Sequence, residues 1–292
     1  MDVLFYLKVV MGTNAEFLSD LQKTMLLDAC NNTTKHAIFC IGCGGGKSLS
    51  WTIPVVRNTS KGFKPKMSIV IIPYCFLLDH HVNSTRNLIG SCAYANISIA
   101  SLKGRDIDEN SLPNELRSKE SLPSLLFVSL EAIRMLVQHH EWKLRELQNE
   151  DYIFKIYIDE CHTILSELNF RANYTCLSEL ARLRIPIAMF SGTFPKQFIQ
   201  SFLHYMFGSN ELRLYNITID DKIFGANPMK MKHIPTNDYI GECSRKVVEF
   251  IREDTSSNVH VIVSTKDEGE YYRIISNELF GCFRMNFSGV FG

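Results

Sequence analysis

A glycine-rich segment ending in a lysine and a serine is the first feature of the chain that could do chemistry. Its sequence is Gly42-Cys43-Gly44-Gly45-Gly46-Lys47-Ser48, and it lies between an apolar run and a helix-like run. Glycines let successive backbone N–H groups turn inward around phosphate oxygens, the lysine reaches the β- and γ-phosphates, and the serine offers a hydroxyl to Mg²⁺. The segment predicts a phosphate loop for a nucleotide. A glycine-rich turn without a ligand is the alternative, because Ile41 stands where the general pattern has glycine.

Two adjacent acids, Asp159 and Glu160, end the apolar run at residues 153–159. Carboxylates at the end of a buried strand are costly unless a partner compensates their charge. In a phosphate-loop enzyme the first acid holds Mg²⁺ together with the loop serine, and the second polarises the attacking water. We therefore expect Ser48 and Asp159 to hold Mg²⁺ and Glu160 to act on the water. For the dipeptide alone, the acidic N-cap of a helix is the competing interpretation.

A third segment, Ser191-Gly192-Thr193, follows the apolar run at 185–191, and alone it would indicate no more than a turn that begins a helix. Together and in this order, the three segments resemble the motor core of superfamily 2 helicases, with its phosphate loop, DExH box and Ser-Ala/Gly-Thr coupling motif. The resemblance implies hydrolysis of ATP by Lys47, Asp159, Glu160 and His162. It also implies that His162 and residues 191–193 couple the γ-phosphate to a nucleic-acid groove.

Within that superfamily, the run from Gly44 to Leu49, with Ile53-Pro54 after it, resembles the first motif of RecQ-type DNA helicases. Gln22 resembles the glutamine that reads the adenine edge, although the aromatic residue and arginine of that motif are Leu18 and Ser19 here. Segments 71–74 and 126–131 resemble the motifs that contact the DNA backbone, and residues 170–171 fall at the end of an aromatic-rich loop that lacks its usual tryptophan. The implied DNA contacts are Pro73, Tyr74, Ser129, Phe170 and Arg171.

Some details, such as Phe190-Ser191-Gly192-Thr193, also resemble the fungal subtelomeric Y-prime element and telomere-linked RecQ-like helicases. The resemblance covers about residues 18–290 and stops at motif IV, near residues 261–266. The later motifs of the family, with the arginine finger and the zinc module, are not among these residues. We therefore expect a truncated chain that binds Mg²⁺-ATP weakly and turns over slowly. Another superfamily 2 motor, acting on RNA or duplex DNA, and a nucleotide-binding remnant without turnover are the rival interpretations.

The elements that must position these residues follow an alternating pattern. Short apolar runs recur between helix-length amphipathic segments, which predicts an α/β fold with a parallel sheet. The predicted strands are residues 37–42, 67–73, 96–100, 125–129, 153–159 and 185–191. We expect a RecA-like domain over residues 1–207, a linker over 208–236, and over 237–292 the start of a second RecA-like domain with strands at 259–264 and 282–287.

Composition limits the partners. The 292 residues carry 31 lysines and arginines against 31 aspartates and glutamates, so nucleic acid must bind in a local groove rather than through net charge. No apolar run approaches the roughly 20 residues of a membrane helix, so we expect no membrane partner. Cys40 and Cys43 have metal-ligand spacing but no second pair nearby, so we expect no structural zinc. The resemblance implies DNA single strands and duplex junctions as partners, and the nucleus as location.

Overall fold

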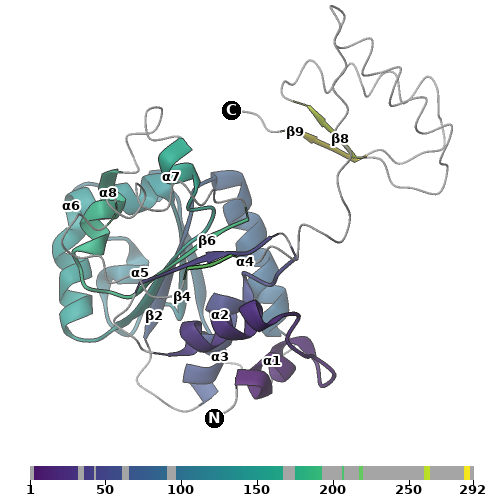
Figure 1. The fold of residues 1–292 in the computed structure, drawn as a ribbon. Coiled ribbons are helices and arrows are strands. Elements are labelled where there is room, and N and C mark those ends of the chain that lie inside the picture. The colour runs from purple at the N-terminus through teal and green to yellow at the C-terminus, as the bar shows by residue number, and fades with distance from the viewer. Residues whose placement is uncertain are drawn as a thin grey trace, which may run out of the picture. The chain divides into compact units, whose positions relative to one another are not determined.

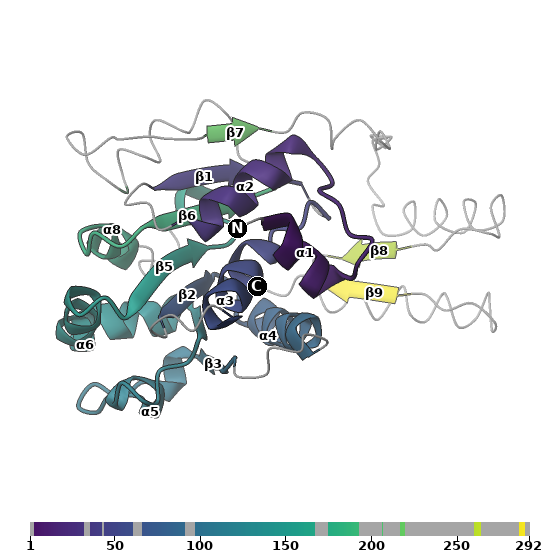
Figure 2. The ribbon, with the colours of Figure 1, turned by 90° about the horizontal axis from the view of Figure 1, so that it is seen from below.

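Seven strands, all paired in parallel, form the central sheet of the computed structural model (Figure 1). The strand order is β3-β4-β2-β5-β6-β1-β7, and it can be followed from β7 at one edge to β3 at the other in Figure 2. The strands are β1 (Ala37–Cys40), β2 (Met67–Ile72), β3 (Ile99–Leu102), β4 (Leu125–Ser129), β5 (Ile153–Ile158), β6 (Ile187–Ser191) and β7 (Ile217–Ile219).

The structure describes residues 3–31, 36–42, 44–60, 66–90, 97–166, 175–192, 206, 217–219, 260–263 and 286–289. The chain divides into two units, Met1–Asn227 and Pro228–Gly292. In the second unit the described residues are β8 (His260–Val263) and β9 (Asn286–Gly289), which pair in parallel. Of the predicted linker, only β7 is described. The sequence did not predict this strand, which extends the sheet beside β1.

The α/β prediction is confirmed, and the reason is visible in the burial of the strands. Every residue of β2, β4, β5 and β6 is buried, which requires helices on both faces of the sheet. The strand predicted at residues 96–100 lies at Ile99–Leu102 instead. Because β3 is an edge strand with only its last residue fully buried, its apolar pattern is too weak to mark its ends.

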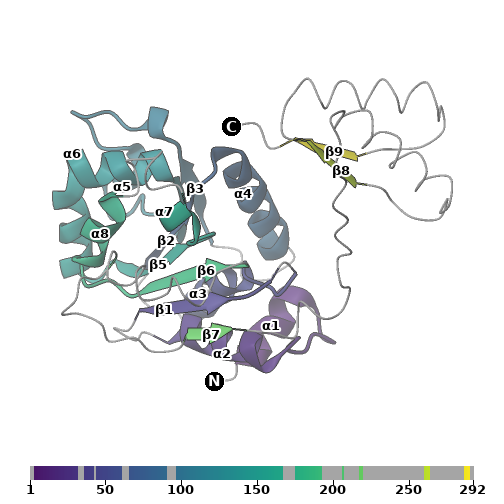
Figure 3. The ribbon, with the colours of Figure 1, turned by 45° about the horizontal axis from the view of Figure 1, so that its top comes forward.

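Helices α1 to α4 cover one face of the sheet, and α5, α6 and α8 cover the other (Figure 3). Each face has its own cluster of buried apolar side chains. The helices are α1 (Val3–Met11), α2 (Asp20–Cys30), α3 (Leu49–Ser60), α4 (Cys75–Gly90), α5 (Asn114–Arg117), α6 (Leu130–Asn149), α7 (Thr163–Ser166) and α8 (Thr175–Ala181), with a 3-10 turn at Gly104–Asp106. No helix in the described part of the chain is long and apolar enough to span a membrane.

Trp51 joins α3 both to the sheet and to α4. Its side chain has an exposed fraction of 0%, and its ring meets those of Phe127, Tyr157 and Phe190 edge to face, with centroids 6.4, 6.2 and 6.0 Å away. Its indole N–H donates to the hydroxyl of Thr85 on α4 at 3.4 Å. Since α3 begins directly after the glycine-rich loop, this packing sets the position of the loop relative to the strands.

Helix α2 is fixed at both ends. Its N-cap is Ser19, whose Oγ accepts the backbone N–H of Gln22 at 3.1 Å. At the other end, the buried Lys155 of β5 donates to the carbonyl oxygen of Asp28 at 2.7 Å, and Arg57 of α3 donates to that of Cys30. Cationic side chains at a helix C-terminus satisfy its free carbonyls and its dipole. These contacts hold Gln22, in the first turn of α2, against the glycine-rich loop.

We expect Trp51→Ala to lower the free energy of unfolding by about 3–5 kcal/mol, because it leaves a cavity between α3, α4 and the sheet. Urea unfolding followed by circular dichroism measures the change. The matched control is Trp142→Ala, since that tryptophan is 56% exposed on α6 and its loss should change stability by less than about 0.5 kcal/mol. Equal effects of the two substitutions would contradict the packing role of Trp51.

Candidate nucleotide-binding and catalytic site

The parallel register brings the predicted functional segments to one edge of the sheet. Cys40 at the end of β1 pairs with Ser191 at the end of β6, and Ile158 at the end of β5 pairs with Met189 of the same strand β6. Strand β6 lies between β1 and β5. The glycine-rich loop, the Asp-Glu pair and Ser191 therefore leave three adjacent strands at their carboxyl ends, where open α/β sheets bind ligands.

The glycine-rich loop has the backbone conformation that its sequence requires. Gly44 and Gly46 have φ values of +78° and +81°, in the left-handed region that favours glycine. A Cβ atom on Gly46 would lie 2.5 Å from the amide nitrogen of Gln22, so no larger residue fits there without displacement. The loop runs directly into the first turn of α3, where Leu49 N–H donates to Gly46 O at 3.0 Å. Cys43 lies outside the described residues.

The ammonium group of Lys47 faces both predicted acids. Its Nζ donates to Glu160 Oε1 at 2.9 Å and lies 3.8 Å from Asp159 Oδ1. One positive charge thus compensates two carboxylates at the sheet edge. Phosphate oxygens of a nucleotide would compete with these carboxylates for the same ammonium group.

Glu160 is held in its ionised form. Beside Lys47 on Oε1, the ring nitrogen Nδ1 of His162 lies 3.3 Å from Oε2, and these partners, His162 first, lower the pKa of Glu160 to about 2. The residue has a φ of +44°, and this conformation is supported by the hydroxyl of Thr163, which donates to Glu160 O at 2.8 Å. A carboxylate this acidic is a poor proton acceptor at neutral pH, so it can orient and polarise water by its charge rather than take a proton from it.

Asp159 is 3% exposed, and this burial raises its pKa, with Lys47 partly offsetting the effect. Its Oδ1 accepts the backbone N–H of Glu160 at 3.0 Å, and its Oδ2 lies 3.3 Å from Nε2 of His81 on α4. Sequence reasoning missed His81. The buried positions of α4, namely Leu78, Val82, Thr85 and Ile89, repeat with helical spacing, and that phase could have placed His81 rather than His80 beside the sheet.

His162 links the second and third predicted segments. Its Nδ1 lies 2.9 Å from the hydroxyl oxygen of Ser191, in addition to its contact with Glu160. Gly192 lies next to the start of the glycine-rich loop, because a Cβ atom on Gly192 would be 3.6 Å from the carbonyl oxygen of Ile41. The structure therefore brings together Lys47, Asp159, Glu160, His162 and Ser191, whereas Thr193 lies outside the described residues.

A divalent cation such as Mg²⁺ fits the donor set at this edge. Mg²⁺ takes oxygen ligands and is usually held by one or two carboxylates together with substrate phosphates. Asp159 supplies a buried carboxylate and Ser48 a hydroxyl at the start of α3. Within the described ranges, no group of three His, Cys, Asp or Glu residues could hold a metal ion by itself. These residues therefore suit a cation that arrives with a nucleotide.

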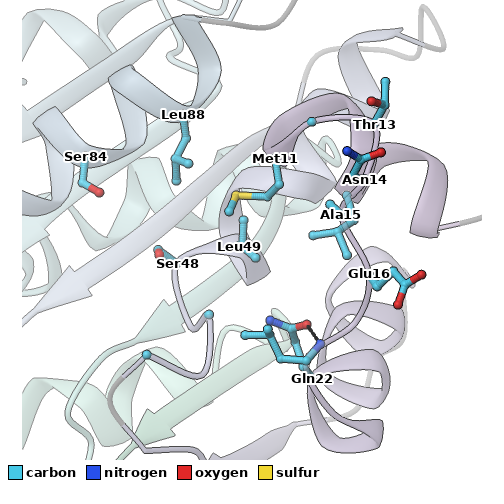
Figure 4. A pocket seen from close by; sticks show the side chains of 15 residues that line it. Met11, Thr13, Asn14, Ala15, Glu16, Gln22, Ser48, Leu49, Ser84 and Leu88 are labelled. Carbon is cyan, nitrogen blue, oxygen red and sulfur yellow. Dashed lines mark hydrogen bonds between the residues drawn. The ribbon is translucent and has the colours of Figure 1, made fainter.

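A cavity of about 790 Å³ opens beside the phosphate loop (Figure 4). Its wall contains Gly44, Gly46 and Ser48 of the loop. The apolar side chains of the wall include Leu7 and Met11 of α1, Leu18 just before α2, Leu49 of α3 and Leu88 of α4. The cavity is large enough for the base and sugar of a nucleotide whose phosphates occupy the loop. The part that α1 plays in this wall had no signal in the sequence.

Gln22 also lines this cavity, but its amide group is used within the protein. Its Oε1 accepts the N–H of Leu18 at 2.8 Å, drawn as a dashed line in Figure 4, and its Nε2 donates to Gly45 O at 3.3 Å. The residue is 2% exposed. In this arrangement Gln22 braces the phosphate loop, and its role in reading the base stays a prediction.

The residues predicted to contact DNA are only partly at the surface. Tyr74 is half-buried, and its ring lies 5.7 Å from that of Phe76, which is 64% exposed and was not predicted. Pro73 and Ser129 are buried, and the hydroxyl of Ser129 accepts Ala132 N–H at 3.1 Å as the N-cap of α6. The ends of β2 and β4 are nevertheless adjacent, with Ile72 paired to Ser129. Phe170 and Arg171 lie outside the described residues.

Comparison with known proteins matches residues 19–202 to the model of a family described as DEAD/DEAH box helicase. No protein of curated function matches the chain in sequence. Among solved structures, DUF1998 helicase MrfA is similar with a TM-score of 0.66 at 13% identity, over 96% of this chain and 42% of that one. DEAD-box helicase Mss116, bound to single-stranded RNA, gives 0.65 at 17% identity, over 94% and 56%.

The S. cerevisiae Dbp5 structure with RNA and ADP-BeF3 gives a TM-score of 0.60 at 12% identity, over 94% of this chain and 64% of that one. At such identities the likeness shows a shared RecA-like helicase fold. The chain spans about two fifths of the length of MrfA and somewhat over half of that of Mss116.

We expect Glu160→Gln to change the acid dependence of stability. A pKa lowered from 4.5 to about 2 means that Glu160 stabilises the fold fully above pH 4.5, and that this contribution is lost as the pH falls toward 2. The difference in unfolding free energy between parent and variant should be at most about 3 kcal/mol near neutrality and shrink below pH 4.5.

Urea unfolding at a series of pH values measures this difference, and Glu179→Gln, at an exposed carboxylate of α8, is the control for loss of a surface charge. A parent-to-variant difference that does not change between pH 6 and pH 3 would show that Glu160 is not held by its cationic partners.

Proposed function

We propose, from the premise that the chain belongs to the DEAD/DEAH box helicase family, that it is an ATP-dependent motor of RecQ-like type acting on DNA. The observation that carries the proposal is the continuous network from Lys47 through Glu160 and His162 to Ser191. The network joins the phosphate loop to the end of β6, as ATP-driven coupling requires. The same proposal makes residues 1–207 the first RecA-like domain and 237–292 the start of a second.

Binding of ATP would change the partner of Lys47. The phosphates draw its ammonium group away from Glu160, because they offer more negative charge. Bound Mg²⁺, held by Asp159 and Ser48, would neutralise charge on the β- and γ-phosphate oxygens. Glu160 then keeps its charge through His162 and orients water toward the γ-phosphate.

His162 can pass this change on, because its Nδ1 carries at most one proton for two acceptors. While Lys47 neutralises Glu160, the Nδ1–H is shared between Ser191 Oγ at 2.9 Å and Glu160 Oε2 at 3.3 Å. When Lys47 leaves, the carboxylate of Glu160 at 3.3 Å becomes the stronger acceptor. The hydrogen bond to Ser191 then weakens, and the end of β6 senses whether phosphate is bound.

The nucleic-acid part of the proposal is supported by the ends of β2, β3 and β4. Tyr74 and Phe76 present an aromatic pair there, with ring planes inclined by 31°. Lys103 is paired with Asp79 at 2.8 Å, and Glu131, which accepts a hydrogen bond from the neutral thiol of Cys75 at 3.3 Å, keeps its negative charge. Base stacking is therefore expected to contribute more than phosphate contacts, as in other single-strand binders.

We expect Lys47→Ala to weaken binding of a fluorescent ATP analogue by about 10–100-fold, because it removes a charge-assisted contact to the phosphates. Glu160→Gln should keep the affinity while any turnover falls. Fluorescence anisotropy titration measures both, with Lys23→Ala on the exposed side of α2 as control. Unchanged affinity in Lys47→Ala would contradict the phosphate-loop assignment.

We expect Phe76→Ala to lower the affinity for a single-stranded oligonucleotide by about 10-fold, the loss of roughly one stacked base. An abasic oligonucleotide of equal length and charge should bind parent and variant alike. Phe5→Ala, at an exposed phenylalanine of α1, is the matched control. If the variant lost affinity for both oligonucleotides equally, stacking would not be the role of Phe76.

The choice of DNA is tested by competition. Single-stranded DNA, duplex DNA and RNA of matched length compete for the chain, and each is then assayed for stimulation of ATP hydrolysis. The proposal expects DNA with a single-stranded region to bind and stimulate best. Preference for RNA would overturn the RecQ-like assignment and leave an ATP-dependent RNA motor of the same family.

A further inference from the structure

The carboxylate of Asp159 is fixed from two sides. The backbone N–H of Glu160 donates to Oδ1 at 3.0 Å, and Nε2 of His81 lies 3.3 Å from Oδ2. The side chain of Asp159 is 4% exposed, so water has little access to either oxygen. Its orientation is thus set by protein groups.

His81 is itself held in place by the core. Its ring packs edge to face on Trp51, with centroids 5.9 Å apart and planes at 71°. Thr85, one turn further along α4, accepts from the indole of the same Trp51 at 3.4 Å. Two residues of one helix face therefore rest on a fully buried tryptophan, and the imidazole has little freedom to leave Asp159.

We propose that His81 is a positioning residue that orients the Asp159 carboxylate for the Mg²⁺ of the bound nucleotide. The inference rests on the proposed function, because it assigns Asp159 to the metal. His81 would not touch the metal or the phosphates. It would act through Asp159, as the hydrogen-bonding partners of metal ligands generally do.

A neutral hydrogen-bond donor suits this task better than a second cation would. Lys47 already lies 3.8 Å from Asp159, and a further positive charge would weaken the carboxylate as a metal ligand. An imidazole with its proton on Nε2 donates to Oδ2 and leaves the carboxylate charge available. A glutamine in the same place could donate in the same way, whereas leucine could not.

The test is the Mg²⁺ dependence of nucleotide binding. Binding of a fluorescent ATP analogue is measured over a Mg²⁺ titration and also in EDTA, for the parent chain, His81→Leu and His81→Gln. We expect His81→Leu to raise the Mg²⁺ concentration for half-maximal enhancement about 10-fold. Binding in EDTA should change less than about twofold, and His81→Gln should restore most of the Mg²⁺ response.

The matched control is His80→Leu, at the exposed neighbouring histidine, which should leave the Mg²⁺ response unchanged. A double-mutant cycle separates positioning from packing, because in an Asp159→Asn background His81→Leu should have no further effect on the Mg²⁺ response. An effect of His81→Leu that persists in that background, or His81→Gln as impaired as His81→Leu, would overturn the inference.

The proposed function fails differently. If the parent chain showed no Mg²⁺-enhanced nucleotide binding, the assignment of the whole site would be wrong. If the parent chain showed Mg²⁺-enhanced binding and His81→Leu matched it, only the role of His81 would be wrong.

Discussion

The positive charge of Lys47, facing Asp159 and Glu160, is the interaction on which the arrangement of the site depends. Two consecutive carboxylates at the end of a buried strand need a cation close by, since burial of unpaired charge is costly. Lys47 can supply it only if β1, which leads into the phosphate loop, and β5 end at the same edge of the sheet, and the pairing of both strands with β6 ensures this. The register of the sheet therefore determines the geometry of the site.

Trp51 supports several parts of the site at once. Trp51 packs on the sheet, directs α3 away from the phosphate loop, and supports α4 through Thr85 and His81. Densely packed interiors transmit displacement because they contain little free volume. A shift of α4 would thus move His81 against Asp159, and a shift of α3 would move Lys47. The geometry around the carboxylates is held by the core and not by surface loops.

Local patterns were enough to predict the buried central strands and to place the candidate site residues at their ends. Strands β2, β4 and β5 are continuous apolar runs, and the phosphate loop and the Asp-Glu pair have distinctive residues at fixed spacing. His81, Phe76 and α1 were missed because their roles arise from contacts that sequence distance hides. His81 lies 78 positions before Asp159, and only the phase of α4 separates it from His80. For Ser129 the structure shows the hydroxyl buried as the N-cap of α6, and its contact with DNA stays a prediction.

The amide group of Gln22 shows how bonds within the protein limit the way in which a side chain can meet a ligand. An amide has one carbonyl oxygen and one NH₂ group, and here the first accepts from Leu18 and the second donates to Gly45. Each atom keeps one further site, because the oxygen has a second lone pair and the nitrogen a second N–H. The directions of these sites are set by the bonds to Leu18 and Gly45, so a base edge would have to fit them as they stand. Recognition of adenine by Gln22 therefore depends on how the base enters the cavity, and the phosphate loop can stay braced while it happens.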